Sequence, residues 1–333
     1  MNERAHVVVA DDYNDVYETA PAVERLRERA TVTIHTTMPK SLDLDQWVER
    51  LKDATIAVAN RERIPLKAPL LDRLPRLEMI AQTAGGGSHL DLAAATERGI
   101  LVTGTSGASA STAELTVALM LAAMRRIPYG DAELRAGRWS QFVGRELAGK
   151  RLGIVGLGRI GSQVARVCVA LGMDVRAWSP TLTEERAAAV GAMYQDLETL
   201  LAVSDIVAVH LRLTPESRGI LTREKLALMQ PSALFVNTAR AALVDEEALV
   251  EMLQDGRLWG AALDVFVKEP LPPSHPLRSL PNVVLTPHIG WIAEDSYRVF
   301  IEGVVENILA YLDDRPVPFP LNPDALARRT ASP

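Results

Sequence analysis

The chain has 333 residues, of which 48% are hydrophobic and 23% are charged, and its formal net charge is −6. A chain of this length usually forms two domains, and its acidic balance gives no reason to expect nucleic acid or an anionic membrane as a partner. No apolar run approaches the ~18 residues of a membrane span, and the run Val7–Ala10 is too short for a signal peptide. We therefore expect a cytoplasmic globular protein whose single cysteine, Cys168, packs in the core.

Short β-rich runs alternate with helical patterns over the first hundred residues. The predicted strands are His6–Ala10, Val32–Thr36, Ile56–Ala59, Met79–Thr83 and Ile100–Thr103. The helical patterns between them include Ala22–Arg29, Asp45–Leu51 and Asp91–Glu97. This alternation predicts a parallel sheet that is covered by helices.

A long alanine-rich segment, Ser109–Arg126, follows the first set of strands and is predicted to be helical. Ser109 or Ser111 could cap its start, and the pattern ends before Pro128. Beyond it, Trp139 is expected to be a packing residue. At the far end of the chain, a last predicted helix, Glu294–Leu312, is followed by a proline-rich tail.

A second set of alternating elements begins at Arg151. The predicted strands are Arg151–Val155, Val175–Trp178, Ile206–His210, Leu234–Asn237, Gly260–Asp264 and Val283–Thr286. The predicted helices are Ile160–Leu171, Glu184–Val190, Arg223–Met229 and Glu246–Gln254. Six strands with crossovers are the number that a complete dinucleotide-binding sheet needs.

A glycine motif, Gly156-x-Gly158-x-x-Gly161, joins the first strand of this second set to its helix. In such a motif the first glycine allows a tight turn, the second lets the backbone approach a pyrophosphate, and the third lets helix and strand pack closely. The helix N-terminus adds unpaired N–H groups and partial positive charge. The strand, turn and helix together predict a dinucleotide site.

Three charged residues each come just after a predicted strand of the second set: Arg240, Glu269 and His288. Taken singly, they have ordinary explanations as a solvated arginine, a surface turn acid and a structural histidine. The carboxyl ends of parallel strands meet at one edge of a sheet, however, so the three should converge beside the glycine loop. An arginine fork, a proton donor and an anion beside that donor suit a 2-keto acid. His89, His210 and His275 have no partners at metal-ligand spacing, so no metal is expected.

From about Met79 to Leu312 the chain resembles the D-isomer-specific 2-hydroxyacid dehydrogenase family. The segments that carry the resemblance are Gly156–Gly161, Asn237–Arg240, Val244–Leu249, Ala262–Leu271, Thr286–Gly290, Thr112–Glu114 and Ala136–Trp139. The resemblance implies an α/β fold with two doubly wound parallel-sheet domains. A Rossmann NAD(P)-binding domain, residues 105–292, would be inserted into a flavodoxin-like substrate domain formed by residues 1–104 and 293–333.

The family also implies roles for single residues. Arg240 would bind the carboxylate and carbonyl of a 2-keto or 2-hydroxy acid, His288 would be the acid/base, and Glu269 would pair with His288. Backbone N–H groups at Gly85 and Gly86 would bind the substrate carboxylate, although three glycines in a row depart from the family pattern. Asp264 would hold the nicotinamide carboxamide. The cofactor contacts implied are at Thr112, Gly156, Gly158, Arg159, Ile160, Gly161, Ser179, Thr238, Asp264 and Gly290. A homodimer is implied as well.

The choice between NAD and NADP depends on the end of the second strand of the set. Ser179 stands where an acid would bind the ribose diol of NAD, and no arginine follows before Arg186. Glu184 and Glu185 add negative charge nearby, so the sequence favours NAD, with NADP possible and poor discrimination.

The resemblance predicts an NAD(P)-dependent oxidoreductase that transfers a hydride between nicotinamide and a 2-keto or D-2-hydroxy acid. Two alternatives remain open at this point. One is a nucleotide-sensing, corepressor-like binding protein of the same fold. The other is formate dehydrogenase, against which Glu269 argues, because formate needs no general acid.

Overall fold

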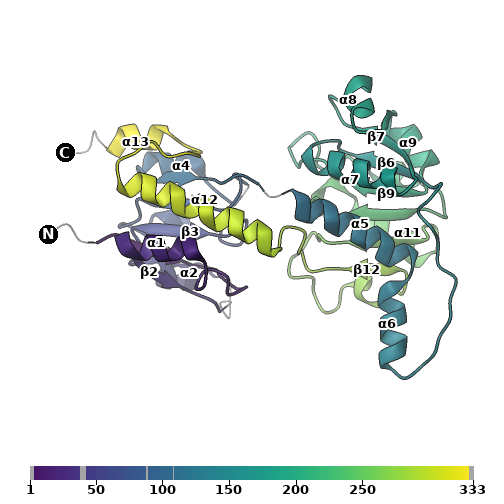
Figure 1. Cartoon of the computed structure of the whole chain (residues 1–333), viewed down its shortest axis with the longest axis horizontal. Helices are drawn as coiled ribbons and strands as arrows, with labels where there is room; N and C mark the ends of the chain where they lie inside the picture. Colours follow the sequence, from purple (N-terminus) through teal and green to yellow (C-terminus); the bar gives the residue numbers. More distant parts are fainter. Residues whose placement is uncertain (1–3, 38–42, 88, 108, 330–333) are drawn as a thin grey trace. The chain divides into compact units, whose positions relative to one another are not determined.

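The computed structural model describes residues 4–37, 43–87, 89–107 and 109–329. The chain divides into two compact units, Met1–Ala108 with Glu294–Pro333, and Ser109–Ala293. Each unit is built on its own parallel sheet (Figure 1). The boundaries between the units fall between Ala108 and Ser109 and between Ala293 and Glu294.

The first unit contains a five-stranded sheet in the order β2-β1-β3-β4-β5. Its strands are β1 (His6–Val9), β2 (Thr31–Ile34), β3 (Ile56–Ala59), β4 (Met79–Gln82) and β5 (Leu101–Thr103). Its helices are α1 (Pro21–Arg29), α2 (Leu44–Leu51), α3 (Ala68–Leu71), α4 (Leu92–Glu97), α12 (Glu294–Leu312) and α13 (Asp324–Arg329). Strands β3 and β4 are buried at every position, as expected for parallel strands that are covered on both faces. All five strands predicted from the sequence are present, with ends that differ by one or two residues.

The second unit contains a seven-stranded sheet in the order β12-β11-β10-β9-β6-β7-β8. Its strands are β6 (Arg151–Val155), β7 (Asp174–Trp178), β8 (Met193–Tyr194), β9 (Ile206–Val209), β10 (Leu234–Asn237), β11 (Gly260–Leu263) and β12 (Val283–Leu285). Its α-helices are α5 (Ala110–Met124), α6 (Ile127–Arg135), α7 (Arg159–Ala170), α8 (Glu184–Ala188), α9 (Leu197–Val203), α10 (Arg223–Leu226) and α11 (Glu246–Gln254). After β8 the strand order reverses, and β9 returns to the other side of β6.

Four details of the secondary structure differ from the sequence-based predictions. The second sheet has seven strands instead of six, because two residues, Met193 and Tyr194, pair with β7 at its edge. Asp196 caps a helix that the sequence reading missed, α9, by accepting the N–H of Thr199. The proline-rich tail leads into a further short helix, α13. The side chain of Ser109 does not cap α5 but accepts a hydrogen bond from Gln163.

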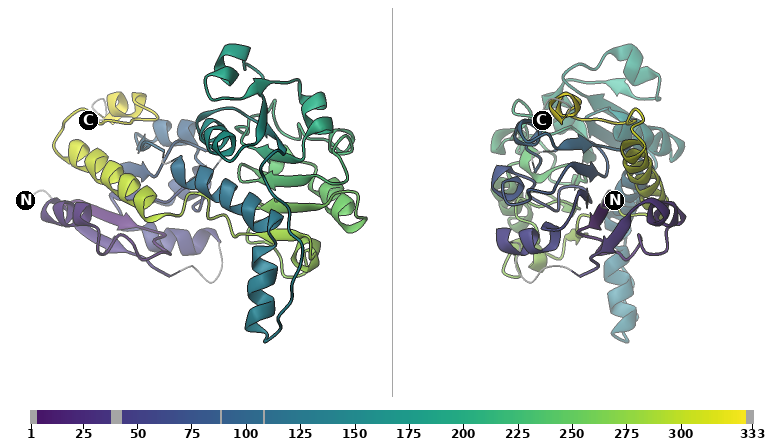
Figure 2. Two further views of the ribbon diagram at one scale, coloured as in Figure 1. Left: turned by 45° about the vertical axis from the view of Figure 1, so that its right-hand side comes forward. Right: turned by 90° about the vertical axis from the view of Figure 1, so that its left-hand side faces the viewer.

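The segment after α5 differs most. Helix α5 ends at Met124, before Pro128, as predicted. Pro128 lies in the first turn of a further helix that was not predicted, α6, where a missing N–H costs little. No residue of α6 is buried, and the helix extends away from the sheet of its own unit (Figures 1 and 2). The prediction that Trp139 packs is wrong, because this residue is 82% exposed in the segment that follows α6.

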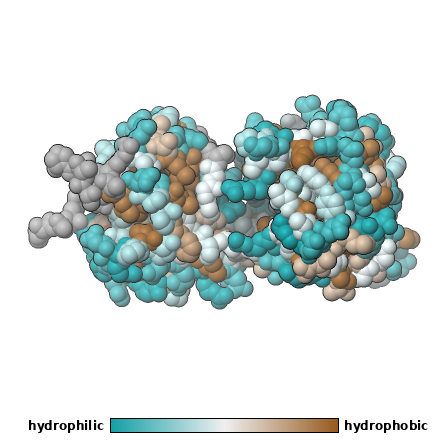
Figure 3. All heavy atoms as spheres, turned by 90° about the horizontal axis from the view of Figure 1, so that it is seen from above, coloured by the Kyte–Doolittle hydropathy of each residue, from teal (hydrophilic) through white to brown (hydrophobic). Residues whose placement is uncertain are grey.

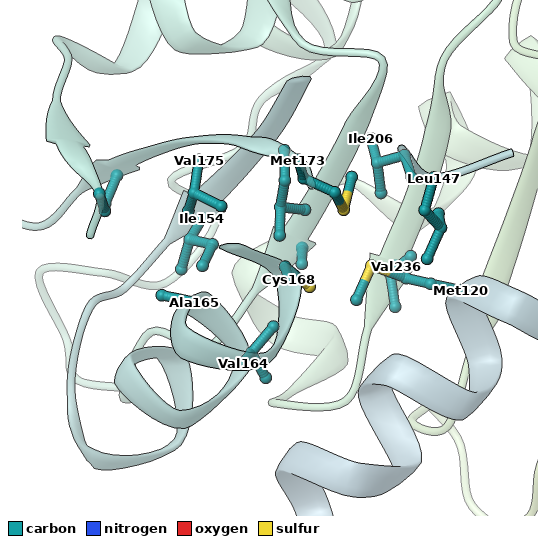
Figure 4. Packing of buried hydrophobic residues seen from close by; sticks show 14 of the residues in the cluster. Met120, Leu147, Ile154, Val164, Ala165, Cys168, Met173, Val175, Ile206 and Val236 are labelled. Carbon is teal, nitrogen blue, oxygen red and sulfur yellow. The ribbon is translucent and has the colours of Figure 1, made fainter. Parts of the chain in front are cut away.

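The main core of the second unit lies where α5 and α7 cover the sheet (Figure 4). Cys168 is fully buried there, near Ile154, Val164 and Val175, which confirms that it is a packing residue. Burial raises the pKa of its thiol to about 12. The thiol is therefore protonated at neutral pH and chemically inert.

Among the described residues, no helix is long and apolar enough to cross a membrane. On the face that Figure 3 shows, hydrophilic residues surround smaller apolar patches on both units.

Candidate active site

Arg240, Glu269 and His288 follow three neighbouring strands of the second unit. Strand β11 pairs with β10 on one side and with β12 on the other, in parallel register. The carboxyl ends of the three strands therefore lie at one edge of the sheet, which is where ligands bind in open parallel folds. The strand order thus brings the three side chains to the same edge, as the sequence predicts.

Glu269 and His288 are in direct contact. His288 Nδ1 lies 2.7 Å from Glu269 Oε2, and the other carboxylate oxygen, Oε1, accepts the N–H of Phe266 at 2.9 Å. Burial disfavours the charged carboxylate. The hydrogen bond and charge of His288, with the Phe266 N–H and the charge of Arg240, nevertheless hold the pKa of Glu269 below its ordinary value. Glu269 is therefore an anion at neutral pH, and it fixes one nitrogen of the imidazole. The other nitrogen, Nε2, is left as the one that could exchange a proton with a substrate.

The turn that carries His288 is held by Asp264. One oxygen of this buried carboxylate accepts the hydroxyl of Thr286 at 2.6 Å and the N–H of Ile289 at 2.9 Å. The other accepts the N–H of Gly290, also at 2.9 Å. Burial raises the pKa of Asp264, and these three donors oppose that rise. Asp264 thus holds the side chain of Thr286 before His288 and the backbone of the two residues after it. His288 itself has a φ of +56°, a left-handed conformation that costs energy outside glycine.

Arg240 lies at the end of a turn that the side chain of Asn237 organises. The Asn237 oxygen accepts the N–H of Ala239 at 3.0 Å, and its amide nitrogen donates to the carbonyl of Arg240 at 3.2 Å. The guanidinium donates to the carbonyl of Ala239 at 2.7 Å, and its charge acts on Glu269. Asn237 is therefore a positioning residue that sequence reasoning quoted only as part of a motif.

The glycine loop between β6 and α7 has the shape that a dinucleotide needs. Gly156 has φ +108°, and a Cβ there would lie 2.5 Å from the N atom of Leu211. A Cβ at Gly161 would lie 2.2 Å from the carbonyl oxygen of Gly156. Gly158, by contrast, faces open space within 4 Å and is the N-cap of α7, whose start has no side-chain cap. The crowded first and third glycines and the open second one leave room for a pyrophosphate at the N-terminus of α7.

A chain of threonines connects α5 to the turn after β12 and to the end of β10. Thr112 donates its hydroxyl to the carbonyl of Gly290 at 2.9 Å. The hydroxyl of Thr116 donates to the carbonyl of Thr112 and lies 2.8 Å from that of Thr238. Thr112 and Thr238, both expected to contact the cofactor, are buried and already hydrogen-bonded within the protein. Thr116 is a further member of the chain that sequence reasoning did not single out.

The loop with three glycines lies in the first unit, immediately after β4. Ala84 has φ +62° and is fixed by Thr105, which accepts the Ala84 N–H at 2.8 Å and donates its own N–H to the Ala84 carbonyl at 2.9 Å. Beyond this anchor, Gly85 and Gly86 are exposed. A Cβ added at Gly85 would meet nothing within 4 Å. Both glycines thus lie at the surface of the unit.

No group of three or more histidine, cysteine, aspartate or glutamate residues that could hold a metal ion occurs in the part of the chain that the structure describes.

A seven-stranded parallel sheet that holds a glycine loop next to the point where its strand order reverses is the architecture of a nucleotide-binding dehydrogenase domain. A family model described as "D-isomer specific 2-hydroxyacid dehydrogenase, NAD binding domain" matches residues 117–290. The chain belongs to the D-isomer specific 2-hydroxyacid dehydrogenase family.

Relatives of the chain within the family carry two different names. The chain is 39% identical to D-3-phosphoglycerate dehydrogenase of Methanocaldococcus jannaschii over 86% of its own length and 54% of that protein. It is 41% identical to glyoxylate reductase of Aeropyrum pernix over 78% of its own length and 81% of that protein. The chain thus spans about half the length of the phosphoglycerate dehydrogenases that it matches, and most of the glyoxylate reductases.

Solved structures agree with the fold of the whole chain. A structure described as a putative D-3-phosphoglycerate dehydrogenase oxidoreductase from Ralstonia solanacearum has a TM-score of 0.92 at 38% identity, covering 98% of this chain and 99% of that one. The TT0316 protein of Thermus thermophilus has a TM-score of 0.82 at 41% identity, covering 95% and 99%.

Proposed function

We propose that the protein is an NAD(P)-dependent oxidoreductase that interconverts 2-keto acids and D-2-hydroxy acids. The observation that carries this proposal is the 2.7 Å contact between His288 and Glu269 at the edge of the sheet where Arg240 also lies. An anion that holds one imidazole nitrogen leaves the other to act as a general acid or base. Membership of the family supports the same reaction.

Each of the three residues has a separate task in this proposal. Arg240 binds the substrate carboxylate and carbonyl through its planar fork of N–H donors. His288 donates a proton from Nε2 to the carbonyl oxygen during reduction and takes it back during oxidation. Glu269 keeps the imidazole oriented and favours its charged form. Asp264 and Thr286 act through His288 by holding its turn.

The cofactor would be held by the glycine loop and by the start of α7. Its pyrophosphate would lie beside Gly158 and accept backbone N–H groups at the start of α7. A side chain at Gly156 or Gly161 would have no space. When bound, nicotinamide supplies or accepts the hydride that the protein's own residues cannot carry. Ser179, Asp264 and Gly290 remain proposed cofactor contacts, and Gly85 and Gly86 remain proposed contacts of the substrate carboxylate.

The substrate is proposed only as a class, a small 2-keto acid or its D-2-hydroxy counterpart. The test is an assay of the full chain with a panel of such acids, including glyoxylate, hydroxypyruvate, pyruvate and 3-phosphohydroxypyruvate, with NADH and with NADPH. Turnover of at least one acid is expected. Tight binding of nicotinamide nucleotide with no turnover of any acid would instead favour a nucleotide-sensing binding protein.

We also propose that the protein is a homodimer and that α6, with residues 136–146, forms the contact. The rings of Tyr129, on α6, and Phe142, in the segment after it, pack edge to face with their centroids 5.3 Å apart. The Arg126 guanidinium lies over the Tyr129 ring. Ile127, Leu134, Trp139 and Val143 are nevertheless 56%, 58%, 82% and 95% exposed. A helix without a buried residue is not stabilised by its own unit, so a second copy is the proposed partner. We also propose that the protein is cytoplasmic.

A further inference from the structure

A second contact between a carboxylate and an imidazole lies in the same unit as the pair formed by Glu269 and His288. The Nε2 atom of His275 lies 3.4 Å from Oε1 of Glu246, and the two side chains are only 20% and 21% exposed. The proposed function uses neither residue. Both lie beside the loop that carries Glu269, however, and this position connects them to the candidate active site.

The Glu246 carboxylate is tied to the loop that follows β11. Its Oε2 accepts the N–H of Val267 at 3.1 Å. The N–H of the preceding residue, Phe266, donates to Oε1 of Glu269 at 2.9 Å. Two consecutive N–H groups of the loop thus donate to two different carboxylates. One of these belongs to the candidate active site, and the other lies in the first turn of α11.

The loop leaves the core at the residue that Glu246 holds. Val265 and Phe266 are buried, whereas Val267 is 64% exposed. Among the described residues, the Val267 N–H is the one backbone group of residues 267–270 that is hydrogen-bonded. Without Glu246, the backbone next to Glu269 would therefore have no hydrogen bond to the rest of the unit. An exposed segment without such bonds opens easily, and the distance from Glu269 to His288 would be less well defined.

The His275 ring is oriented by a backbone contact of its own. Its Nδ1 accepts the N–H of Leu277 at 3.3 Å, at the start of a short 3-10 helix, Pro276–Ser279. A ring nitrogen that accepts an N–H carries no proton, so the ring proton lies on Nε2, which faces Glu246. Leu277 is buried in the core of the unit, and this burial anchors the contact.

The helix turn that carries Glu246 is fixed as well. The Asp245 side chain caps α11 by accepting the Ala248 N–H at 2.9 Å. The backbone N–H of Asp245 donates to the Leu221 carbonyl at 3.0 Å. A negative charge at this end of a helix is favoured by the helix dipole. Glu246 therefore extends from a rigid support to the loop, and its carboxylate is held at both oxygens.

We propose that Glu246 is a positioning residue for the proposed reaction: it holds the loop that carries Glu269 and thereby fixes the distance between Glu269 and His288. His275 in turn holds the Glu246 carboxylate. The inference rests on the pairing of Glu269 with His288 in the proposed function, and it adds a residue that acts through this pair. A displacement of about 1 Å at a catalytic group is enough to lower a rate by about 10²-fold.

The first test compares the kinetics of wild type, Glu246→Ala, Glu246→Gln and His275→Asn with one good substrate from the panel of 2-keto acids. Glu246→Ala should lower kcat by about 5- to 20-fold and change KM by less than about 2-fold, because the displaced group serves proton transfer and not binding. Glu246→Gln keeps an oxygen for the Val267 N–H, so its kcat should return to within about 3-fold of wild type. His275→Asn should have an intermediate kcat, since asparagine still caps the 3-10 helix but is too short to hold Glu246.

Glu247→Ala is the matched control. It removes the same charge from the same turn of α11, at an exposed position that makes no hydrogen bond or ion pair in the described part of the chain. Its kinetics should equal those of wild type. A loss caused only by the changed charge at the helix end would appear in this variant too.

The second test asks whether Glu246 acts through Glu269. If it does, Glu246→Ala combined with Glu269→Gln should lose no more than about 2-fold in kcat beyond Glu269→Gln alone, whereas independent effects would multiply. A third measurement needs no turnover. Hydrogen exchange followed by mass spectrometry should show exchange in the peptide that contains Phe266 and Val267 about 10-fold faster in Glu246→Ala, and unchanged in Glu247→Ala.

The proposal is overturned if folded Glu246→Ala keeps the kcat or the exchange rate of wild type. It is also overturned if Glu246→Gln loses as much as Glu246→Ala, or if the effects of Glu246→Ala and Glu269→Gln multiply. If Glu246→Ala does not fold, His275→Asn takes its place in each comparison. A failure of the proposed function is a different result, since wild type would then turn over no acid while exchange would still show whether Glu246 holds the loop.

Discussion

Glu269 and His288 are 19 residues apart in the chain, yet the carboxylate of one lies 2.7 Å from the imidazole of the other. The contact forms because β11 and β12 are neighbours in parallel register, so that the turns after them share one edge of the sheet. The imidazole is thereby held by one nitrogen, and Asp264 accepts the backbone N–H groups of the two residues that follow His288. This arrangement gives the first two predictions.

His288→Asn should lower kcat for keto-acid reduction by about 10²- to 10⁴-fold, because the variant keeps a polar side chain but has no proton to transfer. Cofactor binding should be unchanged, since the glycine loop is a separate part of the unit. Steady-state kinetics together with calorimetric titration of the nucleotide check both statements. Turnover near that of wild type would show that His288 is not the acid.

Glu269→Gln should lower kcat for keto-acid reduction by about 10- to 100-fold, because the anion that orients the imidazole of His288 is removed. In wild type the folded-state pKa of Glu269 lies below its ordinary value. The carboxylate is therefore charged at neutral pH, and the stabilisation that its lowered pKa contributes is lost as pH falls through the Glu269 pKa. Rates of reduction and oxidation for the two proteins, measured from pH 5 to 10, check this. Equal rates for the two proteins across this range would contradict the proposed role.

Arg240→Lys should raise KM for the keto acid and lower kcat, with a loss in kcat/KM of about 10- to 100-fold. A lysine is a point charge and does not reproduce two parallel hydrogen bonds to a carboxylate and a carbonyl. Kinetics with one good substrate from the panel provide the measurement, and Arg257→Lys, an exposed arginine paired with Asp255, is the control. If the Arg240 variant lost stability but kept its kinetics, Arg240 would be a structural residue.

The double variant Trp139→Ser, Val143→Ser should convert a dimer into a monomer. These side chains are 82% and 95% exposed on the segment that follows α6, and a dimer contact there would bury both. Light scattering after size-exclusion chromatography, at several protein concentrations, gives the mass. Val167→Ser, at an exposed position on α7, is the control and should leave the mass unchanged. A monomeric wild type, or a dimeric double variant, would refute this contact.

The stability of the first unit should depend on the ionisation of Asp11. This carboxyl is fully buried after β1, and burial raises its pKa to about 7 against the opposing effects of Arg63 and of hydrogen bonds from Asn60. Since the folded chain holds this proton more tightly than the unfolded chain, the unfolding free energy should fall as pH rises from about 4 to about 7. Asp11→Asn should flatten that dependence.

Urea denaturation at pH 5, 6, 7 and 8 measures the effect, with Asp53→Asn, at an exposed position, as the control. The same pH dependence in wild type and in Asp11→Asn would show that Asp11 does not titrate in this range.

The sequence predicts most strands of both sheets and the outline of the candidate site, because these depend on local patterns. Apolar runs such as Leu234–Asn237 are long enough to identify a buried parallel strand. A polar residue after such a strand must lie at the carboxyl edge, so Arg240, Glu269 and His288 could be grouped before any strand order was known. Two-residue β8 could not be found in this way, because Met193 and Tyr194 have no pattern of their own.

The sequence alone determined the glycine turn before α7 and the kinds of charged group at the strand ends, since spacing and residue type fix both. Only the tertiary structure decided what those groups contact. The carboxylate of Asp264 receives donors from residues 22 to 26 positions away, and the guanidinium of Arg186 returns to Thr181. The exposure of Trp139 was likewise visible only in the tertiary structure. A long side chain has many rotamers, and the one adopted depends on neighbours that strand pairing and helix packing bring together from distant parts of the chain.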